Sequence, residues 1–398
     1  MSFMQLRRMP LEVPGHERQS PASDDSVPRL RLVYVAGSII PSRAANSIHI
    51  MKMCAALGHN GHDVTLVIPD RPERTQSVSD VFGYYGTDPV FRIVALPWLR
   101  IPGRSLPFAW LAARLAESLR PDFVYGRTIQ ACYFSVLRGI PTIFESHVPL
   151  AEYDRVGAWM FTRMIPHAEL RRVVVTSDAL RRHYEQEYPA LVGRLRTAPD
   201  AADEVPEAAP HERAQHDGTD ALKVGYVGHL YRGRGVELIA ELARRCSWAE
   251  FHVIGGMQRD IEEWRRRCAA ITNLVFHGFC PPAQVQAHMA RLDVMLAPYQ
   301  RRVAIYGNSG DTSRWMSPLK IFEYMAARKP MIASDMPVLR EVLDDSNAIL
   351  VDPEDVDAWQ NALTSLRDSE RCEQLGTKAH QDFVAYYTWR ARADRVLE

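Results

Sequence analysis

Two series of short apolar runs, with helical spacing between the runs, constrain this chain more than any other feature. The first series opens with Leu30 to Val35, then Gly37-Ser38, helical spacing from Ala45 to Leu57, and the apolar run Val64 to Ile68. Strand, glycine turn, helix and strand form a βαβ unit. Further apolar runs lie at 91–95, 123–125, 142–144 and 173–176. The series predicts a doubly wound parallel sheet.

A second series repeats the pattern. It starts with a predicted strand, Lys223 to Val227, a loop, Gly228 to Gly235, and a helix, Val236 to Arg245. Further strands are predicted at 251–254, 274–276, 294–297, 331–333 and 349–351. Residues 204–220, rich in Ala, Pro, Glu and His, are predicted as a linker or insertion. The fold class is therefore α/β, with two Rossmann-like doubly wound domains. Residues 1–28 carry few apolar groups and are interpreted as a disordered leader.

Charge and cysteine usage narrow the class of protein. Lys plus Arg and Asp plus Glu number 48 each, so no net field favours nucleic acid, which is not expected as a partner. The six cysteines show neither CxxC nor zinc-ligand spacing, which indicates reduced thiols. Without a signal peptide core or eighteen uninterrupted apolar residues, a cytoplasmic location is predicted.

The stretch Ser317 to Leu343 reads SPLKIFEYMAARKPMIASDMPVLREVL and contains the most specific pattern. Serine is a preferred N-cap and proline suits the first helical position, so a helix is predicted to begin at Ser317 or Pro318. Lys320 then lies in the first turn, where the macrodipole disfavours a cation unless an anion is bound there. The alternative is an ordinary capped helix with an exposed Lys320 paired to Glu323.

The wording of this stretch resembles the donor-site segment of glycosyltransferase family 4, in the subgroup that carries SPLK-x-FEYMA-x-x-KP followed by SD-x-P-x-LREV. The resemblance runs from about Leu30 to the chain end. It implies the GT-B fold, with an acceptor domain at 29–198, a donor domain at 199–380 and an interdomain cleft between them. The end of the chain, 381–398, is then a helix that crosses back to the first domain.

The resemblance assigns donor-binding residues. Gly228 to Gly235 is similar to the family segment G-R-(x)4-K-G, with His229 and Arg234 at the two basic positions that bind the diphosphate. Glu323 matches the glutamate that binds the ribose. Donor contacts are also expected from Gly235, Ser317, Pro318, Leu319 and Lys320, and from Gly37 and Ser38.

One position departs from the family pattern. Trp315 stands eight residues before Glu323, where the family carries a glutamate that contacts the donor sugar. The sugar is therefore not predicted. Asp311, in the loop Gly307 to Asp311, is a candidate substitute, and a plain surface loop is the alternative.

Groups from the first domain complete the predicted site. His147 lies just beyond the strand Thr142 to Phe144, at the edge where parallel sheets bind ligands, and the family has a pocket histidine near this point. His147 is predicted to be catalytic, with Glu145 orienting its ring or facing solvent. Sugar or acceptor contacts are predicted from Asn46, His49 and Arg127.

Two further segments each allow two interpretations. The mixed aromatic and basic run Trp98 to Leu111 suggests a peripheral membrane contact that would present a lipid-linked acceptor, the alternative being a helix packed on its own sheet. Asp355-Val356-Asp357 has DxD spacing but is interpreted as a helix cap, and no metal site or cofactor is expected.

The predicted function is transfer of a sugar, with retention, from a UDP- or GDP-sugar to a glycan, lipid-linked or small-molecule acceptor in surface polysaccharide or glycoconjugate biosynthesis. Retention is implied by the resemblance alone. The alternatives are a sugar-nucleotide epimerase or hydrolase of the same fold, and a nucleotide-sugar binding protein without turnover.

Overall fold

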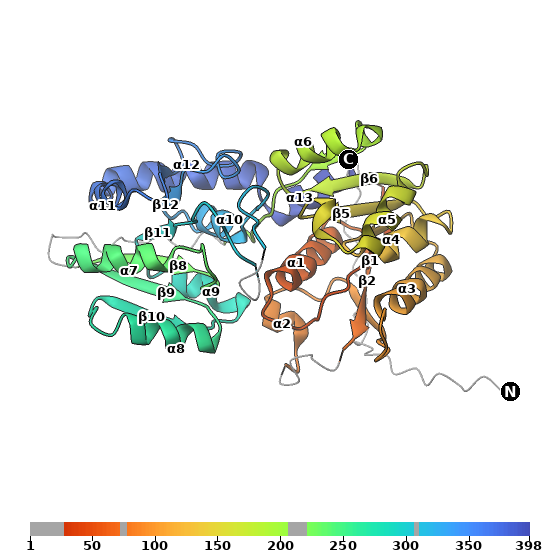
Figure 1. Ribbon diagram of the computed structural model, residues 1–398, viewed down its shortest axis with the longest axis horizontal. Coiled ribbons are helices and arrows are strands. Elements are labelled where there is room, and N and C mark those ends of the chain that lie inside the picture. Colours follow the sequence, from red (N-terminus) through yellow and green to blue (C-terminus); the bar gives the residue numbers. More distant parts are fainter. Residues whose placement is uncertain (1–27, 72–77, 206–220, 306–309) are drawn as a thin grey trace, which may run out of the picture.

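The structure, a computed structural model, describes residues 28–71, 78–205, 221–305 and 310–398. The predicted leader except for Pro28, most of the 204–220 linker and part of the Gly307 to Asp311 loop lie outside these residues. Two lobes are visible in Figure 1, one built around β1 to β7 and the other around β8 to β13.

The first lobe contains a parallel sheet with strand order β3-β2-β1-β4-β5-β6-β7. Its strands are β1 (Arg31–Val35), β2 (Asp63–Asp70), β3 (Arg92–Pro97), β4 (Phe123–Gly126), β5 (Thr142–Ser146), β6 (Leu170–Val175) and β7 (Leu195–Thr197). The prediction missed β7, a three-residue edge strand that carries Arg196 and shows no apolar run. Order reverses between β1 and β4, so the ligand crevice of this sheet lies at their carboxyl ends.

The second lobe repeats this topology with the order β10-β9-β8-β11-β12-β13. Its strands are β8 (Leu222–Val227), β9 (Ala249–Ile254), β10 (Leu274–Gly278), β11 (Val294–Ala297), β12 (Met331–Ser334) and β13 (Ile349–Val351). The predicted α/β class with two doubly wound parallel sheets is confirmed. The second switch point lies between β8 and β11.

Helices cover both faces of each sheet. In the first lobe they are α1 (Ala45–His59), α2 (Val81–Tyr85), α3 (Ser105–Leu119), α4 (Ile129–Val136), α5 (Arg155–Met164) and α6 (Asp178–Glu187), with short 3-10 turns η1 (Leu150–Glu152) and η2 (Pro189–Leu191). In the second they are α7 (Val236–Arg245), α8 (Gln258–Arg267), η3 (Pro282–Gln284), α9 (Val285–Met289), α10 (Leu319–Ala326), α11 (Val356–Ser365) and α12 (Ser369–Tyr386). Helix α7 matches its predicted range because Val236, Ile239, Ala240 and Ala243 recur at helical spacing and are buried.

The chain end returns to the first lobe. Helix α12 stops at Tyr386, and a separate helix, α13 (Trp389–Leu397), follows Thr388, whose hydroxyl accepts a hydrogen bond from the Ala391 N–H. Trp389, Ala393 and Val396 are buried in the same core as the residues of α1. Figure 1 shows α13, in dark blue, among the elements of the first lobe. The nine residues of α13, close to the end of the chain, therefore belong to the packing of its first half.

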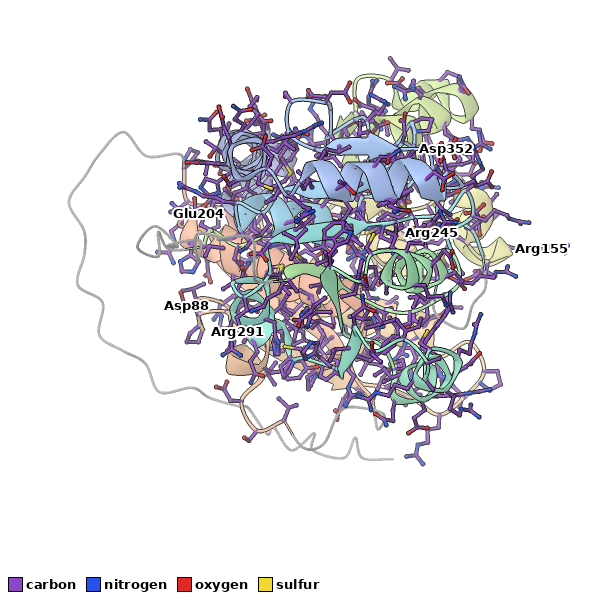
Figure 2. All side chains as sticks on the ribbon, turned by 90° about the vertical axis from the view of Figure 1, so that its left-hand side faces the viewer. Asp88, Arg155, Glu204, Arg245, Arg291 and Asp352 are labelled. Carbon is purple, nitrogen blue, oxygen red and sulfur yellow. The ribbon has the colours of Figure 1, made fainter. Side chains whose placement is uncertain are left out.

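Charged side chains are distributed as expected for two cores enclosed by amphipathic helices. Arg245, Arg291 and Asp352, which are labelled in Figure 2 on the second lobe, are exposed. All six cysteines are free, as predicted. Among the described residues, no helix has both the length and the apolarity needed to cross a membrane.

Candidate active site between the two lobes

The carboxyl ends of both sheets face each other, and the loops after their central strands meet there. Arg43, from the loop after β1, stacks over Phe279 of the second lobe, with 4.1 Å from its guanidinium carbon to the ring centroid. On the other flank, Glu341 accepts hydrogen bonds from the N–H groups of Asp178 and Ala179 at the start of α6. The region between these contacts is the candidate site.

In the second lobe, a glycine-rich loop leaves β8 against the first turn of α10. A Cβ atom built at Gly228 would lie 3.1 Å from Lys320 Nζ, and one at Gly235 would lie 2.0 Å from the Pro298 carbonyl oxygen. Gly235 also has a φ of 83°, which favours glycine. The loop can approach Lys320 and β11 this closely because these positions lack side chains.

Three basic side chains of this region each have a buried nitrogen without a hydrogen-bond partner among the described residues. Lys320 is 7% exposed, and its Nζ lies 3.6 Å from the centre of the Tyr226 ring. Within the described residues, Lys320 Nζ, Arg234 Nε and His229 Nδ1 are buried without a hydrogen-bond partner. Unsatisfied buried donors are costly, so a cluster of them indicates a site completed by a ligand.

Electrostatics support an anion as that ligand. Burial and then the neighbouring Arg234 hold the pKa of Lys320 well below its usual value. The same two causes lower the pKa of His229 to about 4, so this imidazole is neutral near pH 7. An anion would restore the charged lysine and accept its hydrogen bonds.

Two local predictions about this helix are corrected. Helix α10 begins at Leu319 with no side-chain cap, because the Ser317 hydroxyl instead accepts a hydrogen bond from the Asp200 N–H at 2.8 Å. The interpretation of Lys320 as an exposed residue is also wrong, since it is buried against Tyr226. Tertiary contacts outweigh the local preferences in both cases.

Glu323 lies one turn further along α10. Burial and the nearby Asp203 raise the pKa of its carboxyl to about 7. Asp203 itself forms an ion pair with Lys52 of α1. Glu323 thus faces the junction of the two lobes and titrates near neutral pH.

Asp311 and Trp315 occupy structural positions. The Asp311 Oδ1 accepts hydrogen bonds from the N–H groups of Val303 and Ser313, both at 3.0 Å, while its Oδ2 lies 3.8 Å from Arg302 Nε. Trp315 packs against the first lobe, with its ring 5.0 Å from that of His183 on α6. One oxygen of Asp311 is therefore used to hold its own loop, and its predicted contact with the sugar stays a prediction.

In the first lobe, Glu145 on β5 is the centre of a buried network. Its Oε1 lies 2.5 Å from His147 Nε2 and 2.9 Å from His49 Nε2. Its Oε2 accepts a hydrogen bond from the Tyr125 hydroxyl and lies 3.2 Å from Arg392 Nη2. With its side chain fully buried, Glu145 does not face solvent, and the interpretation as an orienting group agrees with its position.

The network keeps Glu145 ionised and His147 neutral. Burial alone would favour the protonated acid, but Arg392 and His49 outweigh it and hold the pKa of Glu145 well below its usual range. Burial and Arg127 lower the pKa of His147 to about 4. Because the carboxylate can only accept, His147 Nε2 carries the proton and its Nδ1 is left as an acceptor.

His49 lies behind His147 rather than on the cleft surface. It is 1% exposed, and its two ring nitrogens face Glu145 and Asp200. The prediction that His49 contacts the sugar or acceptor is therefore corrected to a supporting position. Arg127 remains near the surface, with its Nε 3.9 Å from Glu145 and its side chain 16% exposed.

Arg392, from α13, is the residue that sequence reasoning missed. It is 1% exposed, and burial is outweighed by Glu145, which raises its pKa. A signal was present, because Arg392 lies three residues after Trp389, on the helix face that also carries Ala393 and Val396. An arginine on an apolar helix face indicates a buried partner.

The first βα loop approaches the cleft through Gly37 and Ser38. The Gly37 carbonyl accepts a hydrogen bond from Arg71 Nη2 at 3.1 Å, and the Ser38 hydroxyl accepts one from the Asn46 side-chain amide at 3.1 Å. Asn46 is exposed at the start of α1. These groups lie where a ligand in the cleft would reach them.

Two groups of side chains have the composition of a metal site. In the DxD segment, Asp355 caps α11 and Asp357 pairs with Arg245, which confirms the capping interpretation. Ligand atoms of His49, His147 and Asp200 lie within 4.8 Å of one another. There the His49 nitrogens already face carboxylates, and Arg392 and Arg127 add positive charge, so this group is a poor cation site.

Family models match both lobes. Residues 47–204 match the model described as Glycosyltransferase Family 4, and residues 221–369 match that described as Glycosyl transferases group 1. A 2-deoxystreptamine glucosyltransferase of Streptomyces kanamyceticus is 24% identical over 77% of this chain and 91% of its own length. A GDP-mannose-dependent alpha-mannosyltransferase of Mycolicibacterium smegmatis is 24% identical over 92% of this chain and 96% of its own length.

Solved structures share the fold at low identity. Sucrose-phosphate synthase from Thermosynechococcus elongatus superposes with a TM-score of 0.67 at 17% identity, over 92% of this chain and 97% of its own. The Anabaena protein HepE, in complex with UDP and glucose, gives a TM-score of 0.67 at 12% identity, over 93% of this chain and 98% of its own.

Proposed function

Because this chain is a GT-B glycosyltransferase of the family 4 type, we propose that it transfers a sugar, with retention, from a nucleoside diphosphate sugar to an acceptor in the interdomain cleft. The relatives' names include a glucosyltransferase and a GDP-mannose-dependent enzyme, and HepE binds UDP. Both UDP- and GDP-sugars are therefore candidate donors. Surface polysaccharide or glycoconjugate biosynthesis is the proposed role.

One observation carries the proposal. Lys320 Nζ, which lies beside Gly228, and Arg234 Nε are buried and have no hydrogen-bond partner among the described residues. The N-terminus of α10 adds its dipole to their charge. A diphosphate has the charge and the acceptor oxygens to satisfy this cluster.

The same groups suit the chemistry of transfer. As the glycosidic bond breaks, negative charge develops on the departing diphosphate, and preorganised cations stabilise it in a site that excludes water. Lys320 and Arg234 are held for this role by Tyr226 and Tyr299, whose rings lie against them. His229, which is neutral, contributes a hydrogen bond rather than a charge.

Glu323 and His147 would bind the two ends of the donor. The Glu323 carboxyl can accept hydrogen bonds from the ribose hydroxyls. His147 is 27% exposed, and its Nδ1 can accept a hydrogen bond from a hydroxyl of the transferring sugar. Glu145 would act only through His147, since it has no exposed surface.

Donor binding and turnover are tested by calorimetry and by release of nucleotide from a panel of UDP- and GDP-sugars. Lys320→Met is expected to weaken binding of the nucleoside diphosphate by about 100-fold, because a charge-assisted bond and a desolvated cation are lost. Lys223→Met, which alters an exposed lysine at the other end of β8, is the matched control and should bind normally.

Other outcomes favour the alternatives. Nucleotide and free sugar released without a glycosylated product, across the acceptor panel, would indicate a hydrolase. An epimerised nucleotide sugar would indicate an epimerase, and binding without turnover would indicate an inactive binding protein. Equal binding by Lys320→Met and the unmodified chain would contradict the anion site.

A lipid-linked acceptor is supported by a surface of the first lobe that we call the α3–α5 surface. Its exposed large apolar residues are Leu99, Ile101, Trp110, Leu137, Val156 and Trp159. Arg114 and Arg138 lie over the Trp110 ring, and Arg163 lies over Trp159. Phe108, included in the predicted patch, is instead buried.

The α3–α5 surface has the chemistry of a contact with anionic lipid. Helix α5 carries arginines and no acidic residue, and its first residue, Arg155, extends outward in Figure 2. In Figure 1, α3, α4 and α5 lie on the side of the first lobe away from the second. Basic residues around exposed tryptophans are typical of peripheral membrane binding.

Vesicle sedimentation tests this contact. Vesicles that contain phosphatidylglycerol should bind the protein, and vesicles of phosphatidylcholine alone should not. The double change Trp110→Glu and Trp159→Glu is expected to abolish binding, whereas Val384→Glu, at an exposed position of α12, should leave it intact. Equal binding by both variants would argue against the α3–α5 surface.

A further inference from the structure

The side chain of Arg392 is fixed on every side. Its Nη2 lies 3.2 Å from Glu145 Oε2 and donates to the Ala198 carbonyl at 3.2 Å. Its Nε donates to the Pro199 carbonyl at 2.9 Å, and its Nη1 lies 3.3 Å from Met53 Sδ. These contacts hold the guanidinium in one orientation. Because it pairs with Glu145, it also fixes the orientation of that carboxylate.

Stability alone does not explain a charge pair in this place. Desolvating two ions costs about as much as their attraction returns, and apolar replacements of buried pairs are often tolerated. The effect of the pair is that Arg392 holds the Glu145 carboxylate in one orientation. The other Glu145 oxygen is the one that faces His147 Nε2.

We infer that Arg392 is a positioning residue: through Glu145 it fixes the ring orientation and the Nε2–H tautomer of His147, so that α13 completes the first-lobe half of the active site. The inference rests on the proposed function for what His147 does, but the geometry of the ring can be measured without turnover. Arg392 does not touch substrate.

The hydrogen-bond network around Glu145 also extends to α10 in the second lobe, the helix proposed to bind the donor. Asp200, which follows the two carbonyls bound by Arg392, holds His49 Nδ1 at 2.8 Å and donates its N–H to the Ser317 hydroxyl at 2.8 Å. Ser317 immediately precedes α10 and its Lys320. One continuous set of contacts thus joins His147 to the helix proposed to bind the diphosphate.

Histidine NMR tests the positioning directly. The groups that face the His147–Glu145 pair are Arg127 from the end of β4, His49 from α1, Tyr125 from β4, Asp200 after β7, and Arg392 from α13. With ¹⁵N-labelled histidine, and His147→Gln used for assignment, the unmodified chain should show a neutral Nε2–H ring down to acidic pH. Arg392→Met removes a positive charge that opposes protonation of the pair, so the titration of His147 should move to higher pH.

Kinetics then test the consequence. Arg392→Met is expected to lower kcat by about tenfold or more, as misplaced catalytic geometry does, without changing the Kd for UDP or GDP. Adding it to Glu145→Gln should cause no further loss, because both changes act through the same carboxylate. Arg392→Lys, which keeps the charge, should restore part of the activity and the titration.

Arg395→Met on the same helix is the control, since Arg395 is only partly buried and donates to the Tyr386 carbonyl, away from Glu145. A His147 titration that is unchanged in Arg392→Met would overturn the inference, as would additive losses in the double variant. A chain that shows the expected tautomer but transfers no sugar would refute the proposed function alone.

Discussion

Lys320 Nζ lies 3.6 Å from the centre of the Tyr226 ring and 5.0 Å from that of Tyr299, with no hydrogen-bond partner among the described residues. Two aromatic faces stabilise a cation but offer it no acceptor. A bound diphosphate would supply the acceptors, so the pKa of Lys320 should rise when nucleotide binds. Binding then takes up protons, and affinity falls as pH increases through the pKa of the free lysine.

Calorimetry in buffers of different ionisation enthalpy measures this uptake. At about pH 8 the phosphates of the nucleotide are fully ionised and add nothing to it. Proton uptake on binding should be larger for the unmodified chain than for Lys320→Met, in which only Glu323, with its pKa raised to about 7, remains to respond. Equal uptake in both would assign the proton to another group.

Glu145→Gln should destabilise the protein. Gln leaves Arg392 buried beside a neutral amide, and breaking a buried ion pair costs about 3–5 kcal/mol. Urea unfolding at neutral pH measures the change. The matched control is Glu241→Gln, whose carboxylate pairs with Arg245 on the surface of α7 and should cost less than about 1 kcal/mol.

His147 and His229 should each lower the stability of the protein as pH is lowered from about 6.5, against an opposite contribution from Glu323, whose pKa is raised to about 7. His147 and His229 have pKa values lowered to about 4 in the folded state, so between these limits each binds more protons in the unfolded chain than in the folded one. Each histidine should contribute a loss of the order of 2 kcal/mol. Thermal unfolding from pH 7 to pH 5 should show a smaller decrease for His229→Gln than for the unmodified chain.

A second loss is expected at lower pH. Glu145 and Asp200 have folded pKa values below their usual ones, so their contribution is complete above about pH 4.5 and disappears as pH falls through the folded values. Glu145→Gln should flatten this acid limb. An identical limb in the variant would mean that other carboxylates dominate acid unfolding.

Glu341→Ala should favour an open arrangement of the lobes. Its carboxylate accepts from the Asp178 and Ala179 N–H groups at 2.6 and 2.7 Å and joins α6 to the second lobe. Losing two such bonds at a surface junction should cost about 2 kcal/mol of closure, and kcat/KM should fall by about tenfold.

Small-angle scattering should show a larger radius of gyration for Glu341→Ala. The control, Glu354→Ala, removes only an exposed pair with Arg301 and should change neither quantity. If both variants scatter alike, the closed arrangement depends on other contacts.

Chelation should leave turnover unchanged. The Asp355 and Asp357 carboxylates are occupied by a helix N-terminus and by Arg245, and two arginines lie beside the His49 and His147 rings. Sugar transfer measured with and without EDTA checks this. A loss that Mg²⁺ or Mn²⁺ reverses would show that the donor diphosphate needs a metal.

Apolar periodicity was sufficient to predict both parallel sheets, since strands covered on both faces must be continuously apolar. It did not predict β7, where three edge residues have only one neighbouring strand and need no such run. The same limit applies to the helix ends. Serine is a preferred N-cap residue, yet the Ser317 hydroxyl accepts its hydrogen bond from the Asp200 N–H, which is far away in the chain, and not from the N–H groups of α10.

The sequence, through its two apolar series and its resemblance to glycosyltransferase family 4, assigned Lys320, Arg234 and Glu323 to one region at the edge of the second predicted sheet. Only the tertiary structure decided what surrounds them. Lys320 is buried against the Tyr226 ring, and Glu145 forms an ion pair with Arg392 from a distant part of the chain. Burial and long-range charge set the protonation of these groups, and neither is encoded in the spacing of neighbouring residues.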